Sequence, residues 1–144
     1  ILASEKPAPL RALPGDKLEQ PHLTVSVQQY GYQVGPLVVP GATPCLGCLD
    51  RHRGDSDPGW YAPAAEPAGP VRPPGPGGEE TASATLAAAS AAGQALSFLD
   101  GVAQPVTWSA VLQLRAADGH IGLEPLDFHP DCGCRLQSAR IEAA

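Results

Sequence analysis

Every second residue is apolar over part of the N-terminal half of the chain, and this alternation predicts a β-strand. Residues 21–29 read PHLTVSVQQ, in which one leucine and two valines alternate with polar neighbours. A nearly all-apolar run, residues 34–39, follows, and Gly31 between the two segments is the expected hairpin turn. Pro36 has no backbone N–H, so the second strand should lie at a sheet edge or contain a bulge.

A second hairpin is predicted near the C-terminus. Residues 105–116 again alternate between apolar and polar positions, and residues 120–129 follow the turn-forming pair Asp118-Gly119. The apolar positions of the first segment are Val106, Trp108, Ala110, Leu112 and Leu114. These two segments should form neighbouring antiparallel strands.

Helices are expected between the two hairpins. Residues 44–55 begin as a cysteine-bearing turn and continue as a short helix, which should end before Pro58 because proline cannot extend it. The alanine-rich segment from Thr81 to Gly101 predicts a longer helix, with Thr81 or Ser83 capping its start. Gly101 suits the left-handed position that ends a helix.

We expect the longer helix to pack closely against its neighbour and a further short helix to form near the N-terminus. Leu96 and Leu99 should place bulk on one side of the longer helix, and its alanines should let a neighbouring element approach closely. Residues 9–20 predict a short irregular helix that is interrupted at Pro14-Gly15.

The order strand, strand, helix, helix, strand, strand is typical of a mixed α/β fold with an antiparallel portion. The length, 144 residues, is that of one ordinary domain, which can form a core without disulfides. Residues 63–80 are rich in proline and glycine and lack apolar periodicity, which predicts a flexible loop. We therefore expect a single unit, residues 1–144, divided by this loop.

Charge and hydropathy limit the partners and the cellular compartment that we expect for this protein. The formal net charge of −6 and the pI near 5.0 argue against a nucleic-acid-binding surface. No apolar stretch approaches the ~20 residues needed to cross a bilayer, and nothing near Ile1 is typical of a signal peptide. We therefore expect a cytoplasmic protein with neither nucleic acid nor membrane as a partner. The absence of methionine, including an initiator, suggests a piece of a longer protein.

The four cysteines form two close pairs, and their spacing suits metal binding. Cys45 and Cys48 flank Leu-Gly at the predicted strand-to-helix turn, and Cys132 and Cys134 flank one glycine near the C-terminus. Glycine should let the backbone fold so that both sulfurs of a pair face one point. Four thiolates at ~2.3 Å around one tetrahedral ion form the usual structural zinc site, which has no open position for catalysis.

Other uses of these cysteines stay open from the residues alone. Disulfides are rare in the cytoplasm, and a redox couple lacks the expected strand and long helix around the first pair and leaves the second pair unexplained. Plain burial leaves both spacings to chance. His129, close to Cys132, could replace one cysteine as ligand. Because four thiols are available, we expect it instead to pack against the ligands or orient them. Zinc is the favoured interpretation.

The rest of the sequence shows no active site. Arg51 and Arg53 lie in a segment of alternating acids and bases that could bind an anion or a partner, although a solvated helix face is the simpler interpretation. The chain contains no glycine-rich phosphate loop, no G-x-S-x-G and no specific paired-carboxylate motif. The residues themselves therefore assign no catalytic side chain.

Three segments resemble one protein family. VGPLVVPGATPCLGCLDRHRGDSDPGW (residues 34–60), ALSFLDG (95–101) and HPDCGC (129–134) are similar to the C-terminal half of ThiF-type adenylyltransferases, bacterial relatives of ubiquitin-activating enzymes. The match is closest to the actinobacterial-style branch that is associated with peptide cyclodehydratases. It covers most of residues 21–134.

The resemblance implies the C-terminal part of a Rossmann-like ThiF-type fold with a four-cysteine zinc clamp. It also implies that the parent protein adenylates the C-terminal carboxylate of a ubiquitin-like carrier protein or a precursor peptide. ATP and Mg²⁺ would bind in the N-terminal half of such a protein, so this chain alone should be inactive. Homodimers are common in the family and are expected here.

The sequence departs from the family in one respect, and the family itself offers an alternative function. The second pair is C-x-C, whereas better-known members have C-x-x-C. The peptide-associated branch also includes proteins that have lost ATP chemistry. The alternative is therefore a noncatalytic leader-peptide-binding or scaffold protein of an azoline-forming, peptide-modification pathway.

Overall fold

The computed structural model describes residues 2–4, 20–28, 30–60 and 78–137. The irregular helix predicted within residues 9–20 and most of the loop predicted at 63–80 lie outside these ranges. The last three residues of that loop, 78–80, belong to a helix instead.

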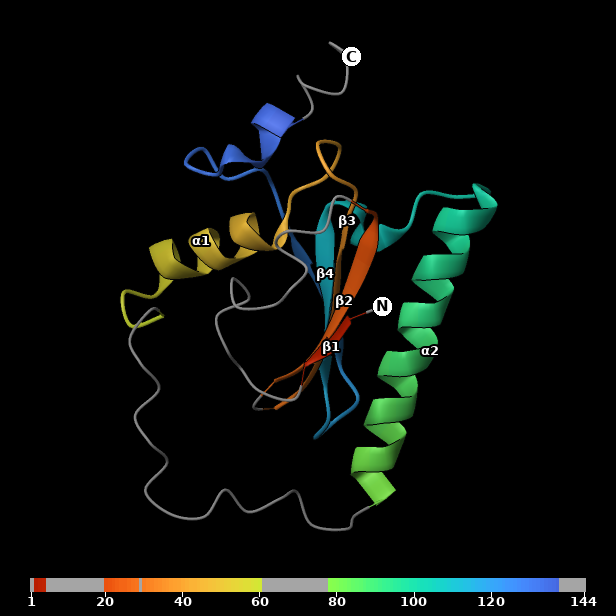
Figure 1. Cartoon of the computed structure of the whole chain (residues 1–144). Coiled ribbons are helices and arrows are strands. Elements are labelled where there is room, and N and C mark those ends of the chain that lie inside the picture. Colours follow the sequence, from red (N-terminus) through yellow and green to blue (C-terminus); the bar gives the residue numbers. More distant parts are fainter. Residues whose placement is uncertain (1, 5–19, 29, 61–77, 138–144) are drawn as a thin grey trace.

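A mixed five-stranded sheet forms the centre of the molecule (Figure 1). Its strands follow chain order: β1 (Leu2–Ser4), β2 (His22–Gln28), β3 (Gly31–Val38), β4 (Ala110–Arg115) and β5 (Ile121–Pro125). β1 runs parallel to β2, and the remaining neighbours are antiparallel. The mixed α/β fold with an antiparallel portion is therefore confirmed. The short β1 was not expected.

Two α-helices flank this sheet. α2 (Gly78–Asp100) lies along one face, and α1 (Leu46–Ser56) lies on the other side of the sheet, beside the C-terminal segment (Figure 1). Two short 3-10 helices complete the described part: η3 (Val106–Trp108) and η4 (Gly133–Gln137).

The first hairpin forms as predicted, with two differences in detail. Gly31 is the first residue of β3, where its φ of 152° places it in a region that favours glycine. β3 pairs with both β2 and β4, so Pro36 does not lie in an edge strand. The register between β2 and β3 shifts between Leu23 and Val25, so the predicted irregularity is present.

Alanine brings α2 close to the sheet, as the sequence predicted. Ala87 and Ala91, four residues apart on one face of the helix, are 0% and 1% exposed. The buried members of this core are Leu23, Val34, Leu37, Ala87, Ala91 and Leu114. Leu96 and Leu99 lie outside it, with 57% and 74% of their surface exposed.

Both ends of α2 can be compared with the sequence. The helix begins at Gly78, before Thr81 and Ser83, so neither residue caps its start. Gly101 follows the last helical residue with a φ of 64°, and the predicted left-handed end is confirmed.

The strand predicted from residue 105 begins only at Ala110. Val106–Trp108 forms η3, although its apolar spacing matched a strand. Thr107 is buried there, and its backbone N–H and hydroxyl both donate to Gln94 Oε1 of α2 at 3.2 Å. This contact with the helix overrides the local alternation.

One finding corrects the expectation about apolar stretches. Thr81–Asp100 of α2 is long and apolar enough to cross a membrane by length and composition. In this structure one stripe of the helix packs on the sheet, and most of its surface faces away from the protein.

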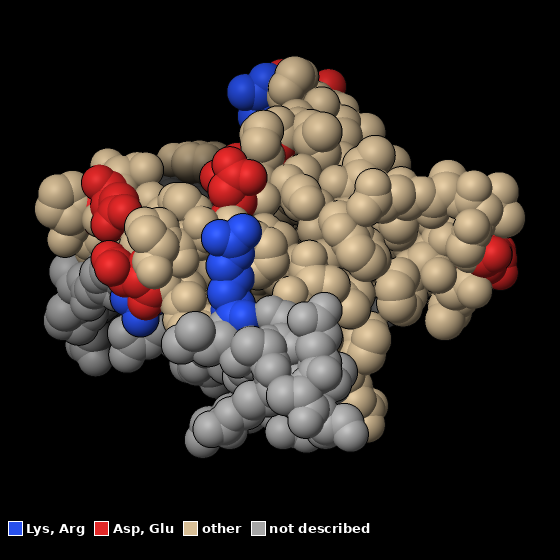
Figure 2. Space-filling model, turned by 90° about the horizontal axis from the view of Figure 1, so that it is seen from above, with Lys and Arg blue, Asp and Glu red and all other residues tan. Residues whose placement is uncertain are grey.

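Charged side chains are sparse on the face of the molecule seen in Figure 2. Among the described residues, acidic and basic groups are scattered, and most of those in view lie on the side of α1. The α2 side of this view is largely uncharged.

Replacing Gly31 by alanine should destabilise the fold strongly. An added Cβ would lie 1.9 Å from the Leu114 carbonyl oxygen, and the positive φ is itself unfavourable for alanine. We expect a loss of at least about 2 kcal/mol in the free energy of unfolding, measured by urea denaturation. Gly93→Ala is the matched control, because nothing lies within 4 Å of its Cβ position. It should stabilise α2 by roughly 0.5–1 kcal/mol, and a similar small effect for both variants would contradict the described register.

Candidate metal centre

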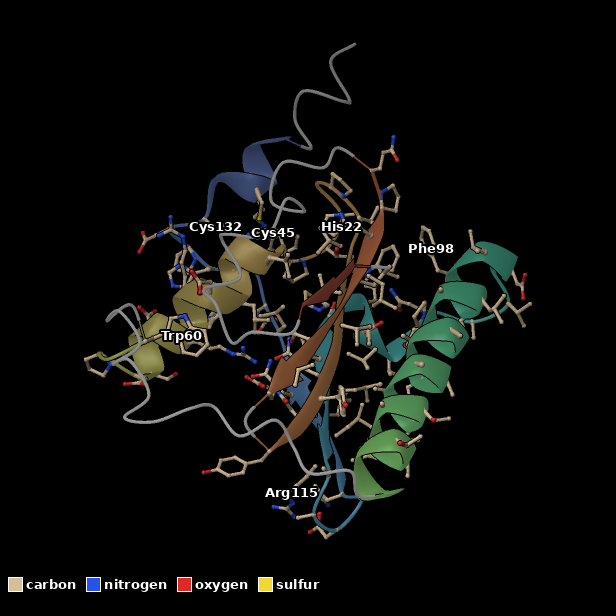
Figure 3. All side chains as sticks on the ribbon, turned by 60° about the horizontal axis from the view of Figure 1, so that its bottom comes forward. His22, Cys45, Trp60, Phe98, Arg115 and Cys132 are labelled. Atoms are coloured by element: carbon tan, nitrogen blue, oxygen red, sulfur yellow. The ribbon has the colours of Figure 1, made fainter. Side chains whose placement is uncertain are left out.

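Four sulfur atoms meet where α1 begins and the C-terminal segment passes beside it. The Sγ atoms of Cys45, Cys48, Cys132 and Cys134 all lie within 4.8 Å of one another. Cys45 Sγ is 3.9 Å from Cys48 Sγ and 3.5 Å from Cys132 Sγ, and Cys48 Sγ is 3.4 Å from Cys134 Sγ. Figure 3 shows Cys45 and Cys132 side by side at this junction. The structure thus brings together all four residues that the sequence singled out.

The first pair is positioned by the start of α1. Cys45 is the residue before the helix, and Cys48 lies in its first turn, with its backbone N–H donating to the Cys45 carbonyl at 3.0 Å. A spacing of three places both side chains on one face of the helix. Backbone N–H groups at a helix N-terminus also favour thiolates over thiols.

A compact turn before the helix fixes its direction. Thr43 is 1% exposed, and its hydroxyl donates to the Leu37 carbonyl at 2.9 Å while accepting the Val39 N–H at 2.7 Å. Because Thr43 ties the end of β3 to the residues just before Cys45, it sets where the first pair lies. No motif in the sequence indicates this role of Thr43.

An apolar cluster brings the second pair to the first. Leu46 and Leu49 of α1 pack with Leu126, which follows β5, and all three are almost completely buried. The complete cluster is Val38, Leu46, Leu49, Val111 and Leu126, with Cys45 packed against it. The Leu126 N–H also donates to the Ser109 carbonyl at 2.8 Å. Leu126 is therefore held in place, and it fixes where the segment that leads to the second cysteine pair begins.

The two glycines do not act as predicted. Neither Gly47 nor Gly133 has a positive φ, so neither is needed for an unusual backbone turn. A Cβ at Gly47 would lie 3.4 Å from Cys45 Sγ and 3.5 Å from Cys132 Sγ, whereas nothing lies within 4 Å of that position at Gly133. Gly47 thus leaves room for the sulfurs to meet, and Gly133 has no evident spatial role.

Burial and mutual hydrogen bonding divide the charge unequally among the thiols. The Cys45 thiol and the backbone N–H of His129 both donate to Cys48 and lower its pKa to about 4. The same hydrogen bond raises the pKa of Cys45, with burial adding to the effect. Burial, followed by hydrogen bonding to Cys48, raises the pKa of Cys134 to about 12. The protein atoms alone therefore favour the thiolate of Cys48 over those of Cys45 and Cys134, and a bound cation would favour ionisation of the latter two.

The donor set and its spacing fit a tetrahedral metal ion. With metal–sulfur bonds of ~2.3 Å, the sulfurs of a tetrahedral site are about 3.8 Å apart. The distances of 3.4, 3.5 and 3.9 Å agree with this value. The cluster could therefore hold a metal ion, and four sulfur ligands are typical of structural zinc.

His129 is close to the cluster but does not belong to the group of converging ligand atoms. It is 5% exposed. Its ring hydrogen-bonds to Asp55 and to the backbone N–H of Asp131, so both ring nitrogens have partners other than a metal ion. Its predicted role as a residue beside the ligands agrees with this placement.

Arg53 is neither solvated nor directed at an external anion. Its side chain is 16% exposed, hydrogen-bonds to Gln33 Oε1, and lies 3.9 Å from a Glu124 carboxylate oxygen. Its guanidinium also stacks over Trp60 at 5.3 Å from the ring centroid. These contacts hold the last turn of α1 on the sheet. Arg51 is exposed.

Comparison with known proteins identifies the fold. No protein-family model matches the chain, and no curated protein matches it by sequence. Solved structures of E. coli MccB are similar in three dimensions. MccB with MccA gives a TM-score of 0.59 at 17% identity, over 92% of this chain and 38% of that one. MccB with ATP gives 0.57 at 16% identity, over 92% and 38%.

A third structure, MccB with AMPCPP and MccA, gives a TM-score of 0.58 at 17% identity, over 90% of this chain and 37% of that one. The chain thus spans well under half of the length of MccB. Within that span it has the fold of MccB, the ThiF-like fold that the sequence predicted.

Proposed function

We propose that this chain is the zinc-binding C-terminal part of an ATP-dependent adenylyltransferase. The observation that carries the proposal is the convergence of the four cysteine sulfurs within 4.8 Å of one another, in a fold shared with MccB. Solved structures of MccB with MccA, with ATP, and with AMPCPP and MccA support a peptide and a nucleotide as partners of a protein of this fold.

In the proposed reaction, the C-terminal carboxylate of a carrier protein or precursor peptide attacks the α-phosphate of ATP. The bond to the β-phosphate breaks, pyrophosphate leaves, and an acyl-adenylate remains. The parent protein would hold ATP and Mg²⁺ in a part with no counterpart among the described residues. This chain would contribute to the reaction structurally and would supply no catalytic side chain.

The metal centre would fix the later strands relative to α1. Cys45 and Cys48 follow β3, whereas Cys132 and Cys134 follow β5, so one ion shared by both pairs would join the two hairpins. When bound, the ion supplies positive charge that allows all four sulfurs to ionise. The apolar contacts of Leu126 with α1 already hold the two segments together from one side.

The same proposal places the protein in the cytoplasm, where thiols stay reduced and available to a metal. We also propose self-association of the parent protein. Apolar side chains exposed on and after α2 support this idea, with Leu99 at 74% and Val102 at 88% exposure.

The metal centre can be tested by substitution together with chelation. Cys48→Ser and Cys132→Ser should each lower the melting temperature by about as much as chelation lowers that of the wild type, because either change removes the same ion. The double variant should lose little more, and chelation should no longer affect it. Equal and additive losses would contradict one shared ion. Elemental mass spectrometry on protein purified without a metal column should find about one zinc per chain.

Nucleotide binding separates the enzyme from the noncatalytic alternative. By calorimetry with Mg·ATP, the parent protein should bind the nucleotide and this chain alone should not, because the chain has no glycine-rich phosphate loop. A parent protein that binds no Mg·ATP would contradict the adenylyltransferase proposal and favour a peptide-binding scaffold. Binding by this chain alone would contradict the assignment of the nucleotide site to another part.

A further inference from the structure

A second set of contacts joins the two cysteine-bearing segments outside the sulfurs. His129 Nε2 lies 2.9 Å from Asp55 Oδ2, which belongs to the last part of α1. The rings of His52 and His129 pack edge to face with centroids 4.9 Å apart. His52 Nε2 donates to the Asp127 carbonyl at 3.1 Å. The C-terminal segment is therefore fastened along α1 before it reaches Cys132.

The partners of His129 define which ring nitrogen carries the proton. The Asp131 N–H donates to Nδ1 at 3.1 Å, so Nδ1 is the unprotonated nitrogen. Nε2 then carries the hydrogen and donates it to the Asp55 carboxylate. A buried ring with both nitrogens bonded has one orientation, since any rotation would break two hydrogen bonds.

The backbone of the same residue touches both cysteine pairs. Its N–H donates to the Cys48 thiol, and its carbonyl accepts the Cys132 N–H at 3.0 Å. Fixing the ring of His129 therefore fixes the peptide groups that orient one sulfur of each pair. Asp55 controls this arrangement from a distance, because it touches the ring and is not one of the converging ligand residues.

We propose that the Asp55–His129 hydrogen bond positions Cys132 for the metal before the ion binds, so that Asp55 helps to set metal affinity. This inference rests on the proposed metal centre. Without the bond, the segment between Leu126 and Cys132 would sample more conformations, and metal binding would have to order it. Residues that orient metal ligands in this way typically change affinity by about 10- to 100-fold.

Zinc affinity of three variants tests the inference, with a chromogenic chelator as competitor. Asp55→Ala should raise the dissociation constant for Zn²⁺ by about 10- to 100-fold. Asp55→Asn keeps an oxygen that can accept the Nε2 hydrogen, and it should stay within about threefold of the wild type. Asp127→Ala is the control for lost charge, because it removes an exposed carboxylate and leaves the backbone contact with His52 intact. It should also stay close to the wild type.

The Co²⁺ absorption spectrum separates positioning from ligation. At saturating Co²⁺, Asp55→Ala and His129→Ala should both show the thiolate charge-transfer and d–d bands of the wild type, because all four sulfurs still bind. A His129→Ala spectrum with altered bands would identify His129 as a ligand and overturn the inference.

Metal affinity also distinguishes failure of the metal centre from failure of the role of Asp55. A wild-type chain that binds neither Zn²⁺ nor Co²⁺ would contradict the proposed metal centre. A wild type that binds tightly, with Asp55→Ala unchanged, would leave the centre standing and overturn the role of Asp55. An equal loss in Asp55→Ala and Asp55→Asn would show that charge, and not the hydrogen bond, controls affinity, and this too would contradict the positioning role.

Discussion

Four thiols packed within 4.8 Å of one another cannot all ionise unless a cation offsets their charges. The hydrogen bonds among the sulfurs already reflect this constraint, since they lower the pKa of Cys48 and raise that of Cys45. Apolar packing brings the two segments together, but it gives no reason for all four of these positions to be cysteine. A shared metal ion gives one, because each thiolate then faces positive charge and not another anion.

The fold prepares this meeting by ordinary packing. The turn held by Thr43 aims α1 away from the end of β3, and Leu46 and Leu49 then pack against Leu126 after β5. A separate core on the other face holds α2 through Ala87 and Ala91. The two cores have different roles. The core that contains Ala87 and Ala91 packs α2 on the sheet, and the core that contains Leu126 brings the cysteine-bearing segments together. The similarity to the fold of MccB covers 92% of this chain.

Local patterns predicted most of the elements, because those elements depend on local periodicity. The alternation in β2, the start of α1 at the first cysteine pair and the turn at Gly119 all follow from near neighbours in sequence. The prediction of a strand at Val106–Trp108 was wrong because Thr107 hydrogen-bonds to Gln94, which belongs to α2 and is not a neighbour in sequence. β1 was missed because three residues carry no measurable period.

The candidate site shows the same division. The spacing of the four cysteines is a local sequence pattern, so the sequence alone predicts the four candidate ligands. The contact of His129 with Asp55 joins residues that are 74 positions apart, and no local spacing in the sequence links the two. The contacts of Arg53 could not be predicted from the sequence either, since its partners Gln33 and Glu124 come from different strands. Such pairs become visible only when the chain is folded.

A shared metal centre requires that one ion be bound by sulfur from all four cysteines. X-ray absorption at the zinc edge of the metal-loaded chain measures the number and type of atoms bound to the ion directly. We expect a single shell of four sulfurs at ~2.3 Å. A shell that contains nitrogen or oxygen at ~2.0–2.2 Å, or fewer than four sulfurs, would contradict it.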